Sequence, residues 1–418
     1  MEVKHRILIE MLIAALKRRD FDLAACLERH KINSFVWEDI YLEAIAHQVH
    51  TLLYPVVRNI NSESGPDSEI MDQWNKEAMV CGIKSHRDEL RIGEVCSTFE
   101  EAGIPVIVLK GMAIKKCFPN PELRSMGDAD ILVHETDLYK AEEILVGMGY
   151  EPDKGVNLKH FKFTGMGTVP IELHWLLSEY EFIKKSEVFY KEIWENLLVI
   201  PLGNTRASTL SWEMQILHMC IHMGTHFRYK GFGLRQLCDL VMVVETKGYV
   251  INWEIVGEKA VEFGLDTFLF AILEVCRKLF RIDIPEVLKC EEIAQSMRIE
   301  LFINDIFKSG AFGQYDSKRN AINTIVNNIS RKEKYFKNKI INGIMILFPS
   351  RKKLSGRNDY KYLKKYPFLL PFAWVQRIIY GLKRKDFNFK SKRDIFTDID
   401  LSKLAAERNS LLLWLGLK

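Results

Sequence analysis

Hydrophobic and polar residues follow a helical rhythm over roughly the first hundred positions. Apolar residues recur three or four places apart, which predicts amphipathic helices over residues 5–19, 35–60 and 74–103. The polar stretch NSESGPDSE (61–69) separates the second helix from the third, and Gly103 and Pro105 end the pattern. We therefore expect a helical N-terminal region over residues 1–95.

From residue 104 onward the apolar runs become short and rich in β-branched residues. IPVIVLKG (104–111), DADILV (128–133) and the two halves of HFKFTGMGTVPIELHW (160–175) predict strands, with short helices between them. The order β-α-β-α-β-β predicts a small mixed sheet, and helical spacing returns at about residue 205. The pattern predicts an α+β fold, a sheet core flanked by helical regions, with boundaries at 1–95, 96–203, 204–330 and 331–418.

The charge of the chain is unevenly distributed. The formal net charge is +4, but residues 331–393 hold 19 Lys or Arg against 3 Asp or Glu, so this segment carries +16 and the rest −12. One interpretation of this basic, aromatic-rich segment is a docking surface for nucleic acid or another anionic partner. A second is an amphipathic segment on an anionic membrane, with Phe372 and Trp374 at the interface. The third is a helical end region with a solvated basic face.

Cysteine usage and hydropathy favour a soluble, cytoplasmic protein. The eight cysteines form no C-x-x-C pair and no zinc-binding spacing, and most lie in apolar helical segments, so we expect reduced, buried thiols. The first apolar run, ILIEMLIAAL (7–16), is interrupted by Glu10 and does not look like a cleavable signal peptide. No apolar stretch reaches the roughly 18 residues that a membrane span needs.

Two aspartates stand at the start of the second predicted strand. Asp128 and Asp130 are separated by one residue, so on a strand both side chains lie on the same face. If the strand that carries Glu172 lies beside it, three carboxylates meet there. Such carboxylates repel one another unless a cation neutralises them, and a divalent metal is the usual one.

A phosphate-binding element precedes the aspartates. Lys110 and Gly111 close the first predicted strand and open a helix, where free backbone N–H groups and a glycine suit a phosphate. The order of these motifs is far more specific than any one of them. A strand leads through Lys-Gly into a helix, G-D-x-D then leads into a second strand, and a later strand carries a carboxylate. The ordered set predicts a two-metal phosphoryl-transfer site. Rossmann and Walker A signatures are absent, since GFG (231–233) and GMG (165–167) lack the remaining spacing.

These motifs resemble, in order, those of the minimal nucleotidyltransferase superfamily with the DNA polymerase β-like fold. The nearest likeness is the bacterial family of uncharacterised nucleotidyltransferases. It is carried by LKG, RSMGDADILV, GY, IELHW and HMCIH…LRQLCDL, is strongest over residues 104–240, and extends weakly to LLPFAWVQRI (369–378). The resemblance implies a nucleotidyltransferase core that transfers a nucleoside monophosphate from an NTP co-substrate and releases pyrophosphate.

The resemblance also implies roles for individual residues. Asp128 and Asp130 would bind Mg²⁺ or Mn²⁺, and Glu172 would be the third acidic residue, a metal ligand or the general base. Gly111, with Gly127 beside the aspartates, would take the phosphate-binding role that a Gly-Ser pair usually fills. The serine is missing from Lys110-Gly111-Met112.

Cationic residues near the motifs are candidates for nucleotide contacts. Arg124 is a potential phosphate fork, with a plain surface arginine as the alternative, and Lys110 is a point charge or a solvated strand end. Arg235 and Asp239, four residues apart on a predicted helix, form a surface pair or face the nucleotide, and for Arg235 we favour the nucleotide.

Histidines accompany the acidic residues. His174 shares a strand face with Glu172, which puts it near any metal, and we expect it to orient the carboxylate rather than to bind the metal itself. His218, His222 and His226 recur every four residues; packing or substrate contact is favoured over zinc, which needs a fourth ligand. His222 is the member expected near the cleft.

Two other functions stay open. One is a nucleotide- or partner-binding protein without catalysis, and the other is a phosphotransferase that moves the γ-phosphoryl group and leaves NDP. The acceptor, whether small molecule, sugar, peptide, protein or RNA, is not indicated by any residue, and neither is the base of the NTP.

Overall fold

The computed structural model contains two compact units. The first comprises Met1–Asp153, Asn157–Tyr315 and Trp414–Leu417, and the second Lys154–Val156, Asp316–Leu413 and Lys418. The structure describes residues 1–153, 160–165, 167–177, 183–311, 322, 326, 350–355, 360, 362–383 and 399–418. Most of the basic segment 331–393 lies outside the described residues, so the anionic partner stays a prediction.

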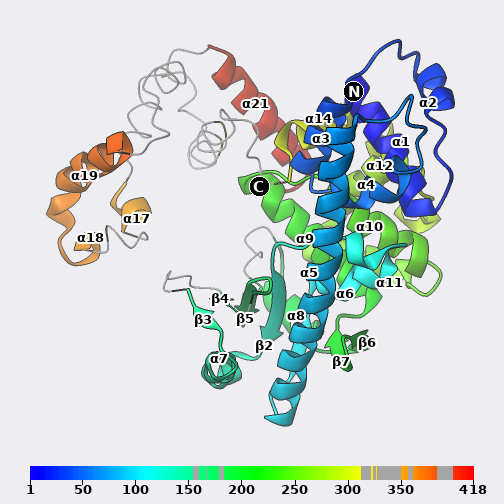
Figure 1. Cartoon of the computed structure of the whole chain (residues 1–418). Coiled ribbons are helices and arrows are strands. Elements are labelled where there is room, and N and C mark those ends of the chain that lie inside the picture. The colour runs from blue at the N-terminus through cyan, green and yellow to red at the C-terminus, as the bar shows by residue number, and fades with distance from the viewer. Residues whose placement is uncertain are drawn as a thin grey trace. The chain divides into compact units, whose positions relative to one another are not determined.

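The N-terminal region is helical, as the apolar spacing predicts. Its helices are α1 (Val3–Lys17), α2 (Leu23–His30), α3 (Trp37–Ala46), α4 (His50–Val57) and α5 (Ser68–Glu101). The single helix expected over 35–60 is divided in two, because Gln48 takes the left-handed conformation (φ 57°) between α3 and α4. The Asp67 side chain caps α5 by accepting a hydrogen bond from the Ile70 N–H. Figure 1 shows α5 passing from the N-terminal helices to the sheet.

Within the described residues, the sheet has seven strands in the order β3-β4-β5-β2-β1-β7-β6. Their bounds are β1 (Val106–Val108), β2 (Ala129–Val133), β3 (Glu151–Pro152), β4 (His160–Thr164), β5 (Ile171–His174), β6 (Leu198–Leu202) and β7 (Thr205–Thr209). β2 pairs antiparallel with β1 and parallel with β5, so the sheet is mixed and the predicted α+β class is confirmed. The β6–β7 hairpin was not predicted, since TRAST (205–209) has no apolar run and was read as the start of the helical region.

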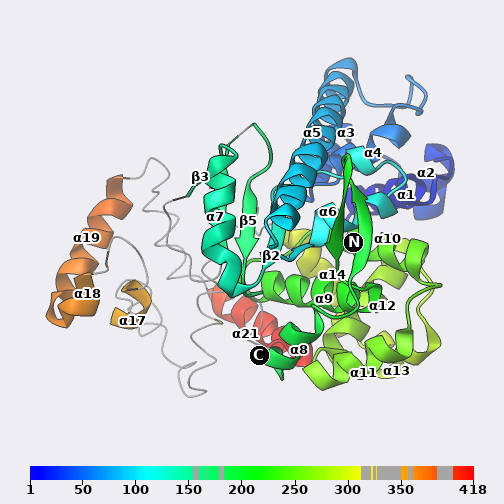
Figure 2. The ribbon, with the colours of Figure 1, turned by 90° about the horizontal axis from the view of Figure 1, so that it is seen from below.

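One face of the sheet is covered by α5 and α7 (Leu138–Gly147). Alternate residues of the central strands, including Ala129, Ile131 and Leu173, are buried against both helices. Figure 2 shows α7 and α5 beside the strands. Because strand side chains alternate, Asp130 and Glu172 point to the opposite face. The fold thus separates an apolar face from a face that carries the candidate chemistry.

The remaining helices of the described residues lie between the strands or after them in the chain. In the first unit they are α6 (Lys110–Ile114), α8 (Ser186–Glu192), α9 (Trp212–Tyr229), α10 (Leu234–Lys247), α11 (Trp253–Phe263), α12 (Asp266–Phe280), α13 (Glu291–Ala294) and α14 (Arg298–Ser309). The described part of the second unit contains α17 (Arg351–Leu354), α18 (Tyr362–Lys365), α19 (Leu370–Lys383) and α21 (Ile399–Trp414). Within the described residues, no helix combines the length and apolarity needed to cross a membrane.

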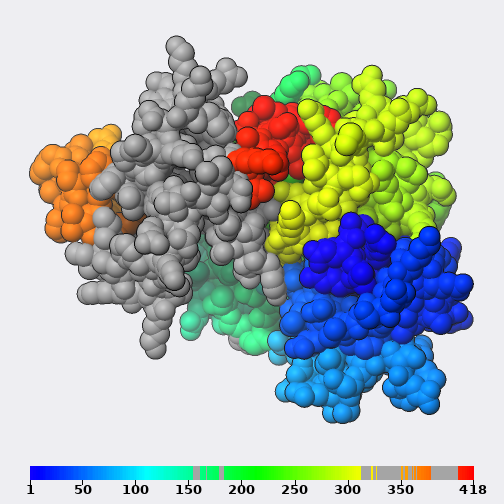
Figure 3. All heavy atoms as spheres, turned by 90° about the horizontal axis from the view of Figure 1, so that it is seen from above, coloured from blue at the N-terminus to red at the C-terminus, as the bar shows by residue number. Residues whose placement is uncertain are grey.

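A partly buried charge cluster joins the N-terminal helices to α10. Glu43 Oε1 lies 3.1 Å from His5 Nε2 and 3.2 Å from His47 Nε2, and its Oε2 lies 2.8 Å from Lys4 Nζ. His47 also accepts a hydrogen bond at Nδ1 from the Leu234 N–H (3.2 Å), at the first residue of α10. In Figure 3 the N-terminal helices (blue) adjoin the yellow surface that includes α14.

Glu43→Gln should lower the free energy of unfolding by about 1.5–3 kcal/mol at pH 7, because hydrogen bonds to a charged group are lost. Burial would raise the pKa of Glu43, but His47, His5 and Lys4 outweigh it and hold that pKa well below its usual 4.5. A depressed folded-state pKa stabilises above the unfolded value and is lost as pH falls through the folded value. The difference between variant and wild type should therefore shrink below pH 4.5. Urea unfolding at several pH values measures it.

Glu143→Gln is the control, because Glu143 is an exposed acid in the interior of α7, away from the helix N-terminus. It should leave the free energy of unfolding almost unchanged at every pH. An equal effect of the two substitutions, or a Glu43→Gln effect that grows in acid, would contradict the assignment.

Candidate functional site

The register of β2 and β5 brings the predicted acidic residues together. In this parallel pair Asp130 lies opposite Glu172, and Leu132 lies opposite His174. Residues opposite one another point to the same face, as do residues two apart on one strand. Asp130, Glu172 and His174 therefore share the face that is not covered by α5 and α7.

These three side chains form a compact donor group. Their ligand atoms, one from each residue, all lie within 4.8 Å of one another. His174 Nε2 is 2.9 Å from Asp130 Oδ1 and 3.7 Å from Glu172 Oε2. Lys110 Nζ donates to the same Asp130 oxygen at 3.0 Å. Among the described residues this is the single group of His, Cys, Asp and Glu that could hold a metal ion.

The electrostatics of the two carboxylates differ. Burial alone would raise the pKa of Asp130, but the Lys110 ammonium and the hydrogen bond with His174 outweigh it and hold that pKa far below its ordinary value. For Glu172, burial and then the Asp130 and Asp128 carboxylates raise the pKa. Asp130 is therefore firmly ionised, whereas the negative charges around Glu172 make its ionisation unfavourable unless a cation is near. The two carboxylates together favour the binding of a cation.

Asp128 lies at the edge of this group. It is exposed and precedes the first residue of β2, and it is not one of the three residues within 4.8 Å. It lines the same cavity of about 370 Å³ as Asp130, Glu172 and His174. Small-molecule sites are usually clefts of about 300–1,000 Å³, so the cavity is large enough to be one. Gly127, also exposed, lines it as well.

Arg124 is not a surface residue: it lines the cavity as a buried cation that is paired with Asp239. It is 4% exposed, and its Nε and Nη2 donate to Asp239 Oδ1 and Oδ2 at 2.9 and 2.6 Å. Its guanidinium lies against Gly111, where a Cβ would be 2.8 Å from Arg124 Cζ. Gly111 therefore makes room for this ion pair, and the phosphate-binding roles of Gly111 and Arg124 stay predictions.

Arg235 is the cation that α10 presents to the cavity. Its Nη1 donates to the Ser125 carbonyl (3.3 Å), which also accepts from Arg124 Nη1 (3.2 Å). Its Nε is buried without a hydrogen-bond partner among the described residues. Burial and the neighbouring Arg124 lower the pKa of Arg235 to about 10, so the group remains a cation at neutral pH. Asp239, expected as its helical partner, binds Arg124 instead.

Helix α9 forms the opposite wall of the cavity. The helix runs unbroken through Gly224, and His222, His226 and Lys230 line the cavity at four-residue spacing. The His222 and His226 ring centroids are 4.3 Å apart, whereas His218 is fully buried. In the part of the chain that is described, the three histidines do not gather into a metal-binding group, so packing and cleft contact remain the better interpretation.

Residues 33–281, more than half of the chain, match the family described as uncharacterised nucleotidyltransferase. The chain belongs to this family. No match is found among curated proteins. The nucleotidyltransferase match contains β2, β5, α9 and α10, and with them every predicted site residue.

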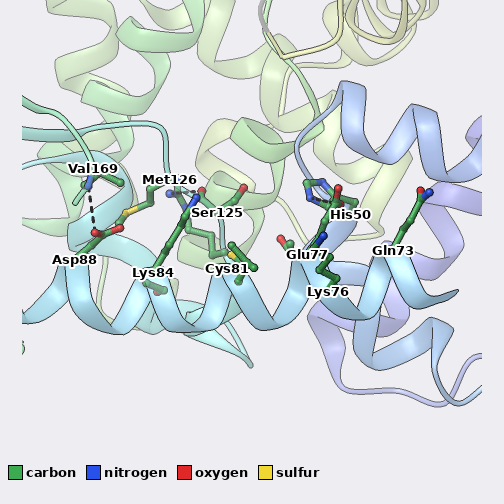
Figure 4. A pocket seen from close by; sticks show the side chains of 14 residues that line it. His50, Gln73, Lys76, Glu77, Cys81, Lys84, Asp88, Ser125, Met126 and Val169 are labelled. Atoms are coloured by element: carbon green, nitrogen blue, oxygen red, sulfur yellow. Dashed lines mark hydrogen bonds and ion pairs between the residues drawn. The ribbon is translucent and has the colours of Figure 1, made fainter. Parts of the chain in front are cut away.

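The nucleotidyltransferase chain carries a second cavity beside the first. This cavity of about 570 Å³ shares Arg124 and Met126 with the one at Asp130. Figure 4 shows Gln73, Lys84 and Asp88 along one side of α5, with Lys84 and Asp88 near Met126 and Gln73 nearer His50. Burial raises the pKa of the Cys81 thiol in this cavity, which argues against a reactive thiolate. Sequence reasoning missed this surface, because the α5 residues that line it form an ordinary polar stripe.

The cysteines of the nucleotidyltransferase form no disulfide, and most of them are buried. All eight cysteines are free, and six of them are buried. The expectation of reduced, buried thiols therefore agrees with the structure for most of them.

Proposed function

We propose that this nucleotidyltransferase moves a nucleoside monophosphate from an NTP to an acceptor and releases pyrophosphate, with a divalent metal in the cleft. The observation that carries the proposal is the group of Asp130, Glu172 and His174 on adjacent strands, inside a chain of this family. A DNA polymerase β-like core, as implied by the sequence motifs, is part of the same proposal.

The donor chemistry of the group fits a divalent cation. Two carboxylates and one imidazole offer three ligand atoms within 4.8 Å on rigid strands, and the carboxylates carry excess negative charge. Mg²⁺ or Mn²⁺ would be held by Asp130 and Glu172, with Asp128 at the cavity edge. When bound, such an ion neutralises phosphate charge and lowers the pKa of the attacking hydroxyl.

The reaction itself is a displacement at phosphorus. The acceptor oxygen forms a bond to the α-phosphorus of the NTP, and the bond from that phosphorus to the oxygen leading to the β-phosphorus breaks. The electron pair leaves with pyrophosphate, and the proton of the acceptor hydroxyl passes to a carboxylate of the cleft. The chain contributes mainly position and charge, as is general for phosphoryl transfer.

The cations of the cavity suit the triphosphate. Lys110 lies at the entrance to α6, Arg235 on α10 and Lys230 at the end of α9, and all three line the cavity that contains Asp130. Arg235 is held by the Ser125 carbonyl, so its guanidinium is oriented before a substrate arrives. We assign these residues to the phosphates and leave the acceptor and the base unassigned.

The test uses ATP, GTP, CTP and UTP labelled at either the α- or the γ-phosphate, with Mg²⁺ or Mn²⁺. Small-molecule, RNA and protein fractions of a cell extract serve as acceptors. We expect the α-label to enter one fraction with release of pyrophosphate, and the transfer to disappear in a double Asp128→Asn, Asp130→Asn variant.

Two outcomes would overturn the proposal. Transfer of the γ-label with formation of NDP would indicate a phosphotransferase. Metal-dependent NTP binding without turnover on any fraction would indicate a binding protein.

A further inference from the structure

The candidate metal-binding group differs from the all-carboxylate set that the motifs suggest. Its third member is the His174 imidazole, and Asp128 lies outside the group. His174 is 5% exposed, and its Nε2 points at Asp130 Oδ1 (2.9 Å) with Glu172 Oε2 at 3.7 Å. The nitrogen is therefore placed among the carboxylate oxygens rather than behind them.

The sheet fixes the position of this imidazole. β5 is an interior strand, paired with β2 on one side and β4 on the other, and His174 is in register with residues of both. A side chain on a strand anchored at both edges can change direction only by rotating about its own bonds. Burial of the imidazole and the contact of its Nε2 with Asp130 Oδ1 (2.9 Å) restrict that rotation, so the nitrogen is preorganised for the position that it occupies.

We propose that His174 binds the metal directly through Nε2, together with Asp130 and Glu172, and that this makes the site selective for Mn²⁺ over Mg²⁺. This inference rests on the proposed function only in assuming that the bound ion takes part in nucleotidyl transfer. Mg²⁺ is a hard cation that is bound by oxygen ligands, whereas Mn²⁺, although it also favours carboxylate oxygens, belongs to the first-row transition metals, which accept an imidazole nitrogen. A nitrogen in the set therefore strengthens Mn²⁺ binding more than Mg²⁺ binding.

The test measures binding, not activity. Mn²⁺ binding is followed by the electron paramagnetic resonance signal of free Mn²⁺, and Mg²⁺ by competition against it. Pulsed resonance on the Mn²⁺-loaded protein, with ¹⁴N and ¹⁵N labelling, detects a directly coordinated nitrogen. We expect that nitrogen coupling in the wild type.

Two His174 variants and one control make the test specific. His174→Asp supplies a third carboxylate, so it should abolish the nitrogen coupling and lower the ratio of Mn²⁺ to Mg²⁺ affinity by about tenfold, at the low end of effects at metal sites. His174→Gln should abolish the coupling as well. His226→Gln removes another histidine of the same cavity and should change neither quantity. Circular dichroism checks that each variant is folded.

Failure of this inference and failure of the proposed function are distinguishable. No nitrogen coupling in the wild type, or coupling that survives in both His174 variants, would overturn the inference even if the enzyme transfers nucleotides. Nitrogen coupling that depends on His174, in a protein without any transfer activity, would support the inference and contradict the proposed function.

Discussion

Asp130→Asn should reduce nucleotidyl transfer by about 1,000-fold or more, at the upper end of what one lost electrostatic contact costs an enzyme. Asp130 is the centre of the candidate site: Lys110 and His174 both contact its Oδ1 atom at about 3 Å, and Glu172 lies opposite it on β5. The amide has nearly the same shape but no charge, so the cation would lose its most firmly ionised ligand. The rate of pyrophosphate release measures the effect.

Glu143→Gln is the matched control for this substitution. Glu143 is an exposed acid on α7, which covers the other face of the sheet, so its amide variant should transfer at the wild-type rate. A folded Asp130→Asn protein that transfers nucleotide at the wild-type rate would remove Asp130 from the mechanism. Equal losses in both variants would indicate general damage rather than a lost ligand.

The sequence predicts those helices and strands whose own residues carry a local hydrophobic pattern. The runs that became β1 and β2 are largely apolar and β-branched, and their residues are buried on both faces of the sheet. In IELH, which became β5, the local signal is the alternation of Ile and Leu on the apolar face with Glu172 and His174 on the other. TRAST, which became β7, is held by pairing with β6 and β1 and by the Thr209 hydroxyl, which donates to the Val108 carbonyl (2.7 Å). Long-range pairing of that kind leaves little trace in local composition.

The candidate site also has features that the local sequence predicts and features that depend on the tertiary structure. Strand alternation is enough to place Glu172 and His174 on one face, and the D-x-D motif is enough to direct attention to Asp130. Whether His174 stands behind the carboxylates or among them depends on distances that alternation does not specify. Likewise, the exposure of Asp128 follows from the point at which β2 begins, one residue later.

The Arg124–Asp239 ion pair has almost no local signal. Its partners are 115 residues apart, on a loop and on α10. The one hint is that Asp239 stands in the apolar run QLCDLVMVV, where a carboxylate must find a partner if it is buried. Its helical neighbour Arg235 looked like that partner, and only the tertiary fold brings Arg124 closer.

Asp239→Asn should lower the free energy of unfolding by about 3–5 kcal/mol, because breaking a buried ion pair leaves the other charge uncompensated. Arg124 is 4% exposed and Asp239 6%, and two parallel hydrogen bonds join them. Loss of the carboxylate would strand the guanidinium between Gly111 and the Ser125 carbonyl. The segment Ser125–Gly127 leads directly to Asp128, so nucleotide affinity should fall together with stability. Urea unfolding and NTP titration measure the two effects.

Two comparisons separate the buried pair from charge removal in general. Glu300→Ala breaks a pair with Lys278 (3.3 Å) whose side chains are 61% and 31% exposed, and it should cost less than about 1 kcal/mol because such pairs are screened by solvent. The double variant Arg124→Met, Asp239→Leu removes both charges, so it should recover much of the stability that Asp239→Asn loses. It should not recover nucleotide affinity if the guanidinium holds the segment before Asp128. A double variant less stable than Asp239→Asn would show that apolar side chains cannot fill the space of the ion pair.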